Sequence, residues 1–387
     1  MKKYLIILVL LLISFGVTNK ISAQGETAVP FLLLAPDSRA GGIGESGVGL
    51  ADNSAAIFWN PAGIAFLTGA EASITHSNWL PAFNLPDLFY EYLTYRQYLE
   101  ELDGSITSSI TYMNFGEFIR TGQDSPDEIG RFRSFDAALT FGYATKLHPD
   151  WGFGLNFRLI HSRLSDKPTA NEDGEGVATS VSFDVATMWR PEKLNLPLIG
   201  NFDNRLSLGI NLSNIGPKIY YIDQAQADPI PTNFRVGLAL RLMEDEYNSL
   251  TLTTDFSKLL VDRDSVGGKD EFYEALFTAW ADDDFNSELR DIVTSVGLEY
   301  WYGAEDFKFA LRTGFFYEDP SFGNRKFVTI GAGIRYDIYG FDFGYITTDV
   351  FPDGDKHPLS DTLRFTLSIG WGPSTSTFEG QGFPRGI

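Results

Sequence analysis

The sequence predicts an all-β fold, a transmembrane antiparallel β-barrel of the outer-membrane type with about 14 strands and a short irregular or helical N-terminal segment. Three observations carry this prediction. Residues 1–23 have the pattern of an export signal. The later segments alternate apolar and polar residues over about ten positions or more, with aromatic residues at their ends. No segment after the export signal is apolar enough and long enough for a membrane-spanning helix.

The export signal is recognised from its order of residue types. Two lysines precede the apolar run 4–13, and the small residues Ser22 and Ala23 suit a cleavage site. The apolar run is too short for a membrane anchor. The chain has no cysteine, which excludes a lipid attachment site of the lipoprotein kind and a disulfide framework. We therefore expect a protein exported through a signal peptide.

The predicted organisation has four parts. Residues 1–23 are the signal peptide, 24–69 an N-terminal periplasmic or lumenal segment, 70–371 the barrel, and 372–387 a polar C-terminal tail. The formal net charge is −21 at pH 7. This acidic balance makes nucleic acid an unsuitable partner.

The clearest strand pattern is a hairpin. Odd positions from Phe135 to Leu147 are mostly apolar or aromatic, whereas even positions are polar or small. After a short turn, the pattern continues from Trp151 to Leu159, so one face of the hairpin is apolar. Similar alternation predicts the later strands, at 181–189, 205–213, 233–242, 250–257, 293–302, 307–317, 327–339, 341–348 and 362–371.

A soluble β-sandwich is the alternative for such alternation. Its strands are typically about five or six residues long and expose few aromatic residues. The longer strands and terminal aromatics favour a membrane barrel. Connection lengths agree, because short periplasmic turns and long extracellular loops are expected. The predicted short turns lie near 103, 148–150, 244–247, 303 and 340, and the long loops at 120–132, 165–176, 215–230, 259–288 and 351–359.

A glycine-rich stretch, "GGIGESG" at 41–47, matches the dinucleotide-binding pattern G-x-G-x-x-G through Gly42, Gly44 and Gly47. An exported chain meets no pool of nucleotides, so we interpret the stretch as architectural. The glycines permit close backbone packing against the barrel wall or positive φ angles. Nearby, Asp37 and Arg39 supply polar groups for the lumen or the periplasmic mouth.

A second motif, Asn-Pro-Ala-Gly, follows at Asn60 to Gly63. Asn60 can cap a helical turn that opens with Pro61, whose missing N–H is not needed at a first helical position. Gly63 then helps the segment to turn tightly. No cofactor is implied by either motif.

Residues 38–67 together resemble the N-terminal signature of FadL-type barrels. The fuller stretch 27–49, with 89–99 and 110–118, resembles the PorV/PorQ family of the Bacteroidetes type IX secretion system. The resemblance implies a non-enzymatic role in the outer membrane of a Gram-negative bacterium, surrounded by its lipid. Such a barrel binds cargo proteins through their C-terminal signal domain at a large translocon barrel. It then passes them to the surface complex that removes the signal and attaches the cargo.

Catalytic and metal-binding patterns are weak. The histidines have no zinc-binding spacing, and the acidic loops 171–176 and 352–356 lack the spacing of an EF-hand. His161, Ser162 and Asp166 lie near one another in sequence at the predicted rim, where such residues are usually solvated. We predict that the protein is not an enzyme and holds no metal.

The polar face of the strands is mixed in charge, whereas transport of hydrophobic compounds needs a continuous apolar path. These charges favour the secretion role over the alternative, a FadL-type transporter of hydrophobic small molecules. The charged residues predicted to face the lumen are Asp136, Arg158, Asp184, Arg190, Arg235, Arg241, Asp255, Arg312 and Arg364.

The long predicted loop 269–291 has a helix-like apolar spacing among acidic residues. Its aromatic side chains either fold over the barrel mouth or form an exposed patch for a protein partner. The first predicted loop contributes aromatics to either arrangement. The candidate partner-contact residues are Trp79, Phe83, Phe272, Tyr273, Phe277 and Trp280.

Overall fold

The computed structural model describes residues 27–81, 87–121, 127–165, 176–197, 200–223, 227–261, 271–281, 284–304, 307–351 and 358–372. The predicted signal peptide and almost all of the predicted C-terminal tail, 373–387, lie outside these residues.

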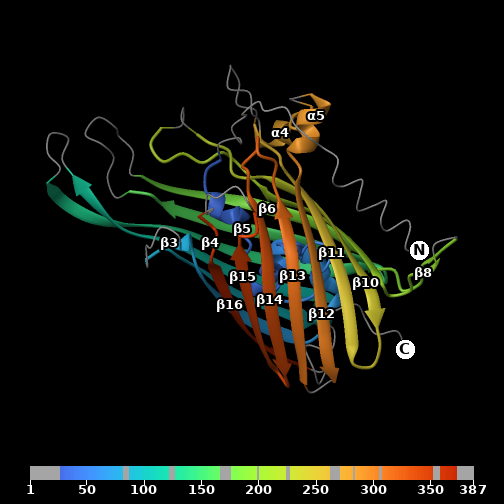
Figure 1. Cartoon of the computed structure of the whole chain (residues 1–387). Coiled ribbons are helices and arrows are strands. Elements are labelled where there is room, and N and C mark those ends of the chain that lie inside the picture. Colours follow the sequence, from blue (N-terminus) through green and yellow to red (C-terminus); the bar gives the residue numbers. More distant parts are fainter. Residues whose placement is uncertain are drawn as a thin grey trace.

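Fourteen strands of the described residues form one closed barrel (Figure 1). Each strand pairs antiparallel with its neighbours, and the ring closes where Ala70 of the first strand lies opposite Trp371 of the last. The predicted fold class and strand number are therefore confirmed. The strands are β1 Ala70–Asn78, β2 Phe89–Leu99, β3 Gly104–Thr121, β4 Glu128–His148, β5 Trp151–Arg163, β6 Val177–Trp189, β9 Leu206–Ile215, β10 Asn233–Glu244, β11 Asn248–Leu259, β12 Val293–Ala304, β13 Phe307–Tyr317, β14 Lys326–Tyr336, β15 Tyr339–Thr347 and β16 Thr362–Trp371.

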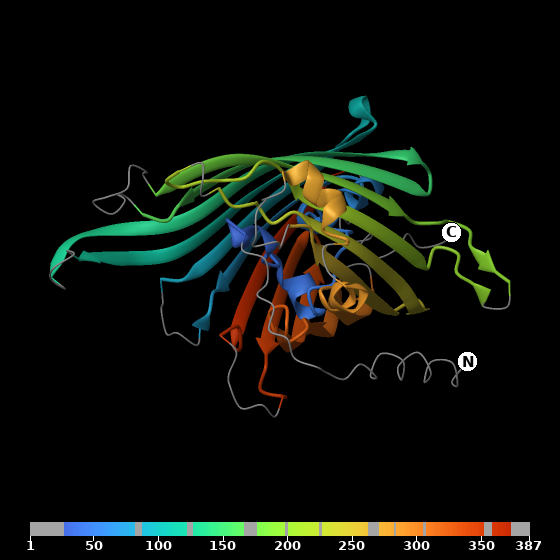
Figure 2. The same cartoon turned by 90° about the horizontal axis from the view of Figure 1, so that it is seen from above.

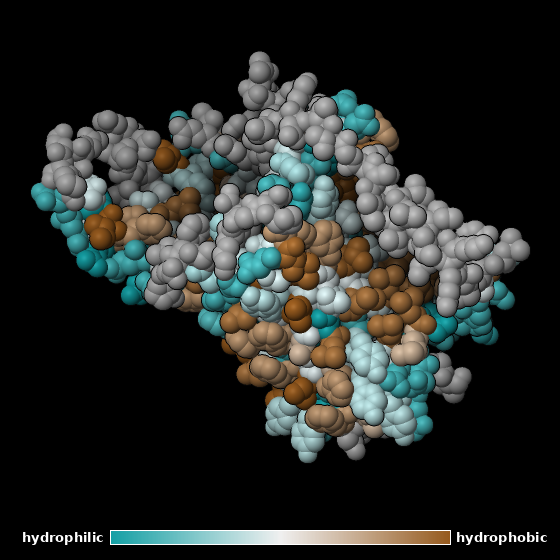
Figure 3. All heavy atoms as spheres, viewed as in Figure 1, coloured by the Kyte–Doolittle hydropathy of each residue, from teal (hydrophilic) through white to brown (hydrophobic). Residues whose placement is uncertain are grey.

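The two faces of the barrel wall differ as the alternation predicts. On β4 and β5, outward residues such as Phe141 and Leu155 are exposed, and apolar residues gather on the outer face of β12 to β16 (Figure 3). All nine charged residues predicted for the lumen are buried inside the barrel. The wall therefore has an apolar side for lipid and a charged interior. Among the described residues, no helix is long and apolar enough to cross a membrane.

Aromatic side chains form rows near both ends of the outer face. At one end, Trp151 and Trp189 have ring centroids 6.2 Å apart. At the other end, a continuous row crosses β1 to β5, with neighbouring centroids 5.6–6.2 Å apart. Such rows suit the two membrane interfaces. The residues of this second row are His76, Phe89, Tyr112, Phe135 and His161.

The connections are short at one end of the barrel and long at the other, as the sequence predicts. One predicted loop is wrong, because most of 120–132 is strand: β3 continues to Thr121 and β4 begins at Glu128. Gly, Pro and Asp residues made this stretch look like a loop, but cross-strand pairing extends the hairpin. The longest connection at the short-turn end carries a small two-stranded sheet, β7 Asn195–Leu196 with β8 Gly200–Asn201.

The N-terminal segment lies inside the barrel and fills its lumen (Figure 2). Its short helices are η1 Pro30–Leu33, α2 Ser38–Gly42, α3 Ala56–Trp59 and η2 Pro61–Phe66. The α2 helix packs on β14 and β15, whereas η2 packs on β4 and β5. We refer to residues 27–69 as the plug.

Candidate functional site

The plug is held to the wall by a ladder of buried ion pairs. Arg39 binds both carboxylate oxygens of Glu299, at 2.7 and 2.6 Å, and also pairs with Asp52 of the plug. Glu299 in turn binds Arg312 at 2.7 Å, and Arg312 reaches Asp342 at 2.8 Å. Each charge lies between opposite charges, which offsets the cost of burying it. The ladder therefore joins the plug to β12, β13 and β15.

The glycine-rich turn binds wall side chains through its backbone amides. The N–H groups of Gly47 and Val48 donate to Asp255 at 2.7 and 2.8 Å. The N–H of Gly44 donates to the Thr329 hydroxyl at 2.8 Å. Amides that would cradle a phosphate in a nucleotide site are thus engaged by the barrel itself.

Gly44 is required by its surroundings. Its φ angle is +73°, and a Cβ there would lie 2.7 Å from the backbone nitrogen of Phe315. Gly42 lies against Gly331 of the wall. Within the plug, Gly47 lies against the Trp59 ring. The close approach of plug and wall therefore needs small residues on both sides.

Asp37 and Asn60 organise the two turns of the plug. Asp37 caps α2 by accepting from Ala40 N at 2.9 Å and also accepts from Trp59 Nε1 at 2.6 Å. Burial raises the pKa of the Asp37 carboxyl, although these two hydrogen bonds act in the opposite direction. Asn60 accepts from Ala62 N at 3.1 Å and caps η2, with Pro61 at the first position.

Gly63 follows in η2 and approaches Ala51 so closely that a Cβ would overlap it. Asn60 also reaches the wall, because its Nδ2 donates to the Thr187 carbonyl at 3.1 Å. Sequence reasoning missed the wall asparagines that bind the plug backbone: Asn156 donates to Ile57 O at 2.8 Å and Asn211 to Trp59 O at 2.9 Å. The alternation of inward and outward residues along each strand could have placed these asparagines on the inner face.

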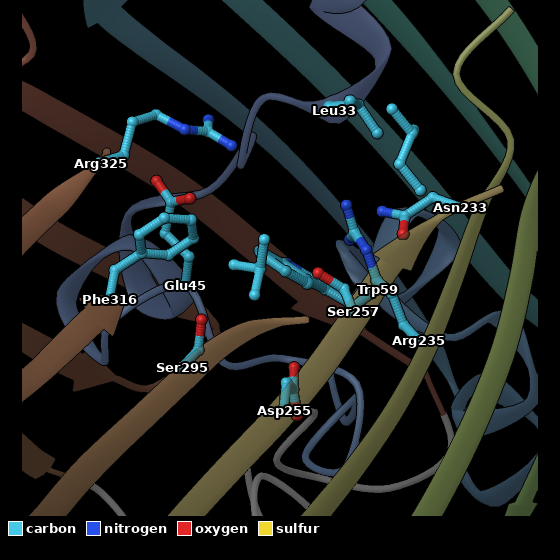
Figure 4. Close-up of a pocket in the computed structure, with 12 residues that line it drawn as sticks. Leu33, Glu45, Trp59, Asn233, Arg235, Asp255, Ser257, Ser295, Phe316 and Arg325 are labelled. Atoms are coloured by element: carbon cyan, nitrogen blue, oxygen red, sulfur yellow. The ribbon is translucent and has the colours of Figure 1, made fainter. Parts of the chain in front are cut away.

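A small cavity of about 60 Å³, lined by both charged and apolar side chains, remains between plug and wall (Figure 4). Trp59 and Glu45 of the plug line it, with Arg235, Asp255 and Arg325 of the wall. Sites for drug-sized ligands are usually about 300–1,000 Å³ and mostly apolar. This cavity has room for a few waters only.

At the long-loop end, the segment between β11 and β12 forms two helices, α4 Phe272–Thr278 and α5 Phe285–Arg290. A capping box between Glu271 and Glu274 begins α4, and the Asp284 side chain caps α5. The helix-like spacing predicted for this loop is therefore confirmed.

The second helix, α5, is anchored to the wall by ion pairs. Lys258 of β11, which is buried, binds Glu288 at 2.7 Å and Asp291 at 2.6 Å. Arg290 binds Asp319 at 2.9 Å, and this hydrogen bond raises the pKa of Arg290. Burial opposes ionisation of Asp319, but its hydrogen bonds prevail and lower its pKa. Both groups therefore stay charged.

Both helices, α4 and α5, present exposed aromatic side chains. Phe277 is 79% exposed, Phe285 75% and Tyr273 54%. We call Tyr273, Phe277 and Phe285, together with the exposed apolar Leu289, the aromatic platform. The sequence did not single out Phe285. This residue directly follows the helix cap Asp284 and lies outside the apolar spacing that predicted a helix in this loop.

The other candidate residues that the structure describes pack against a neighbouring side chain or the core. Trp280 folds back, with its ring edge-on to Phe234 at 5.3 Å between centroids. Phe272 is partly buried and lies edge-on to Tyr273, and Trp79 packs against the core at the barrel mouth. Phe83 lies outside the described residues.

The rim residues do not form a catalytic group. His161 lies on the outer face, where it bonds the Thr179 hydroxyl at 3.0 Å. Ser162 lies on the inner face and donates to Asp136, so neighbouring residues on one strand point to opposite sides. Asp166 is outside the described residues. Among described residues, no group of three or more His, Cys, Asp or Glu side chains is arranged to hold a metal ion.

Comparison with known families gives one match, the model for "Type IX secretion system protein PorV", over residues 18–265. No curated protein matches the sequence. Among solved structures, the Pseudomonas putida toluene transporter TodX is 11% identical, with a TM-score of 0.48, 91% of this chain covered and 99% of that chain. A Pseudomonas aeruginosa FadL homologue is 12% identical, with a TM-score of 0.47, 87% of this chain covered and 98% of that chain. Similarity at this level does not extend to activity or ligand.

Proposed function

Because the chain belongs to the PorV family of type IX secretion system proteins, we propose that it binds exported cargo proteins through their C-terminal signal domain. It receives them at the large translocon barrel and passes them to the surface complex that removes the signal and attaches the cargo. The plug and short turns face the periplasm, and the long loops face the outside of the cell. The barrel does no covalent chemistry in this role.

The aromatic platform is the observation that carries this proposal. Phe277 of α4 and Phe285 of α5 are exposed, and ion pairs of Lys258 and Arg290 fix α5 to the wall. Exposed aromatic residues on a rigid support are typical of protein-binding hot spots, because little conformational freedom is lost on binding. The platform therefore suits a protein partner outside the cell.

The alternative role, transport of hydrophobic small molecules, has less support. The lumen is filled by the plug, and several of its charged side chains form buried ion pairs, such as Arg39 with Glu299 and Arg312 with Asp342. The cavity beside Arg235 and Asp255 is small, and charged side chains stand in its lining. Neither feature offers an apolar route.

Binding of a purified C-terminal signal domain to the purified barrel tests the proposal. We expect the double variant Phe277→Ser, Phe285→Ser to weaken binding by about 2 kcal/mol or more, which is typical of hot-spot aromatics. The matched control, Leu102→Ser, changes an exposed apolar residue at the short-turn end and should bind like the wild type. Equal affinity of all three proteins would remove the platform from the proposed role.

A further inference from the structure

The hairpin of β3 and β4 extends past its neighbours at the long-loop end. The last residue of β3 that pairs with β2 is Asn114, and pairing of β4 with β5 begins at Phe135. Beyond these positions the two strands pair only with each other in the described residues, from Gly116 opposite Ser134 to Thr121 opposite Glu128. We call residues 116–121 and 128–134 the arm.

The arm turns away from the barrel. A β-bulge interrupts the register between Asn114 and Gly116, and Gly116 has a φ angle of +85°. Bulges bend a strand pair and increase its twist. Figures 1 and 2 show the hairpin reaching outward, beyond the outline of the other strands.

The two faces of the arm carry different groups. Phe118 and Phe132 lie opposite each other and stack with centroids 5.6 Å apart. They continue the inner face of the wall, because Ser134 next to them is buried inside. Phe118 on β3 is still 46% exposed there.

The opposite face is held across the strands by Arg131, which binds Glu117 at 2.9 Å and Glu128 at 2.7 Å. These groups are exposed, so the pairs add little stability. An isolated two-stranded hairpin is only marginally stable in water. A third strand along β3 would pair one of the two edges of the arm and bring its side chains beside Phe118.

The edges of the arm define the kind of partner. Each strand leaves one row of backbone N–H and C=O groups without a strand partner among the described residues. Such edges are templates for an added strand, in which backbone hydrogen bonds give affinity and alternate side chains give specificity. These rows of backbone groups suit an extended polypeptide as the partner. Phe118 favours the β3 edge, because apolar side chains of that polypeptide can pack on its ring.

We propose that the arm receives an extended β-strand of the cargo's C-terminal signal domain along the open edge of β3, with apolar side chains of that strand on Phe118. This inference rests on the proposed function, because it names a contact of the same cargo. The arm and the aromatic platform are then two separate contacts at the extracellular end.

Hydrogen–deuterium exchange on the full-length protein tests this contact, with a purified signal domain of one cargo protein from the same bacterium as the probe. Strand addition should slow exchange about tenfold or more at alternate backbone amides of 117–121, and leave the turn at 100–103 unchanged. Contact through side chains alone would not produce this alternation. The variant Phe118→Ser should lower affinity about tenfold, whereas Leu102→Ser should not.

Three results would overturn the proposal. Binding of the domain without any change at 117–121 removes the arm contact but leaves the proposed function standing. Protection that appears without the domain and rises with protein concentration assigns the edge to a second copy of the chain. Absence of binding to the wild-type protein overturns the proposed function and the arm contact together.

Discussion

Glu299 is the carboxylate on which the plug's main ion-pair ladder depends, since it binds Arg39 and Arg312 at once. Replacing it with glutamine leaves two buried arginines without their shared charge partner. We expect Glu299→Gln to lower the free energy of unfolding by about 3–5 kcal/mol, as for other broken buried pairs. Urea unfolding in lipid vesicles measures this, with the exposed Glu192→Gln as the control. A loss no larger than that of the control would contradict the role of the ladder.

Gly44 offers a second test at the scale of one residue. An added methyl group meets the backbone of Phe315, and the positive φ angle is itself unfavourable for alanine. Gly44→Ala should therefore lower the free energy of unfolding by more than about 1 kcal/mol. Gly130→Ala is the matched control, because nothing lies within 4 Å of its Cβ position. Equal stability of the two variants would show that plug and wall do not pack closely at Gly44.

Single residues were predictable where their role is local. Asn60 followed by Pro61 indicates a cap, and the structure has this cap. Arg39 was placed among the lumenal polar groups, but its partner Glu299 is 260 residues away in sequence. No local pattern selects Glu299 from the other acidic residues, because the strand register of a closed barrel brings the pair together.

At the scale of elements, Lys258 holds the helix α5 to the wall. It is buried between Glu288 and Asp291, which both need a cation nearby. Lys258→Met should release α5 from the wall, so backbone amides of 285–290 should exchange faster with deuterium by about tenfold or more. The exposed Lys193→Met is the control and should leave exchange in α5 unchanged. Unchanged exchange at 285–290 in the Lys258 variant would mean that other contacts hold α5.

The strands were predictable because period-two alternation is strong where one face meets lipid and the other a packed lumen. The ends of β3 and β4 were not, because residues 122–127 and their surroundings contain Gly, Pro and Asp. Pairing between Phe118 and Phe132 extends the hairpin past those signals. Cross-strand contacts of this kind depend on register, which the sequence does not show directly.

At the scale of the whole molecule, the closed barrel and its charged interior follow from the sequence, whereas the sequence left the N-terminal segment open between the periplasm and the lumen. The N-terminal segment fills the lumen through contacts that reach many strands, from Asp255 on β11 to Asn156 on β5. With the lumen filled, the aromatic platform and the arm are two exposed features of the described residues that a partner can reach.

The most direct test of this account is affinity purification of the tagged protein from gently solubilised outer membranes, with mass spectrometry of everything that co-purifies. The account predicts recovery of a large translocon barrel together with exported proteins that share a C-terminal signal domain. Recovery of the barrel alone, with small apolar molecules bound and normal secretion in a deletion strain, would contradict it.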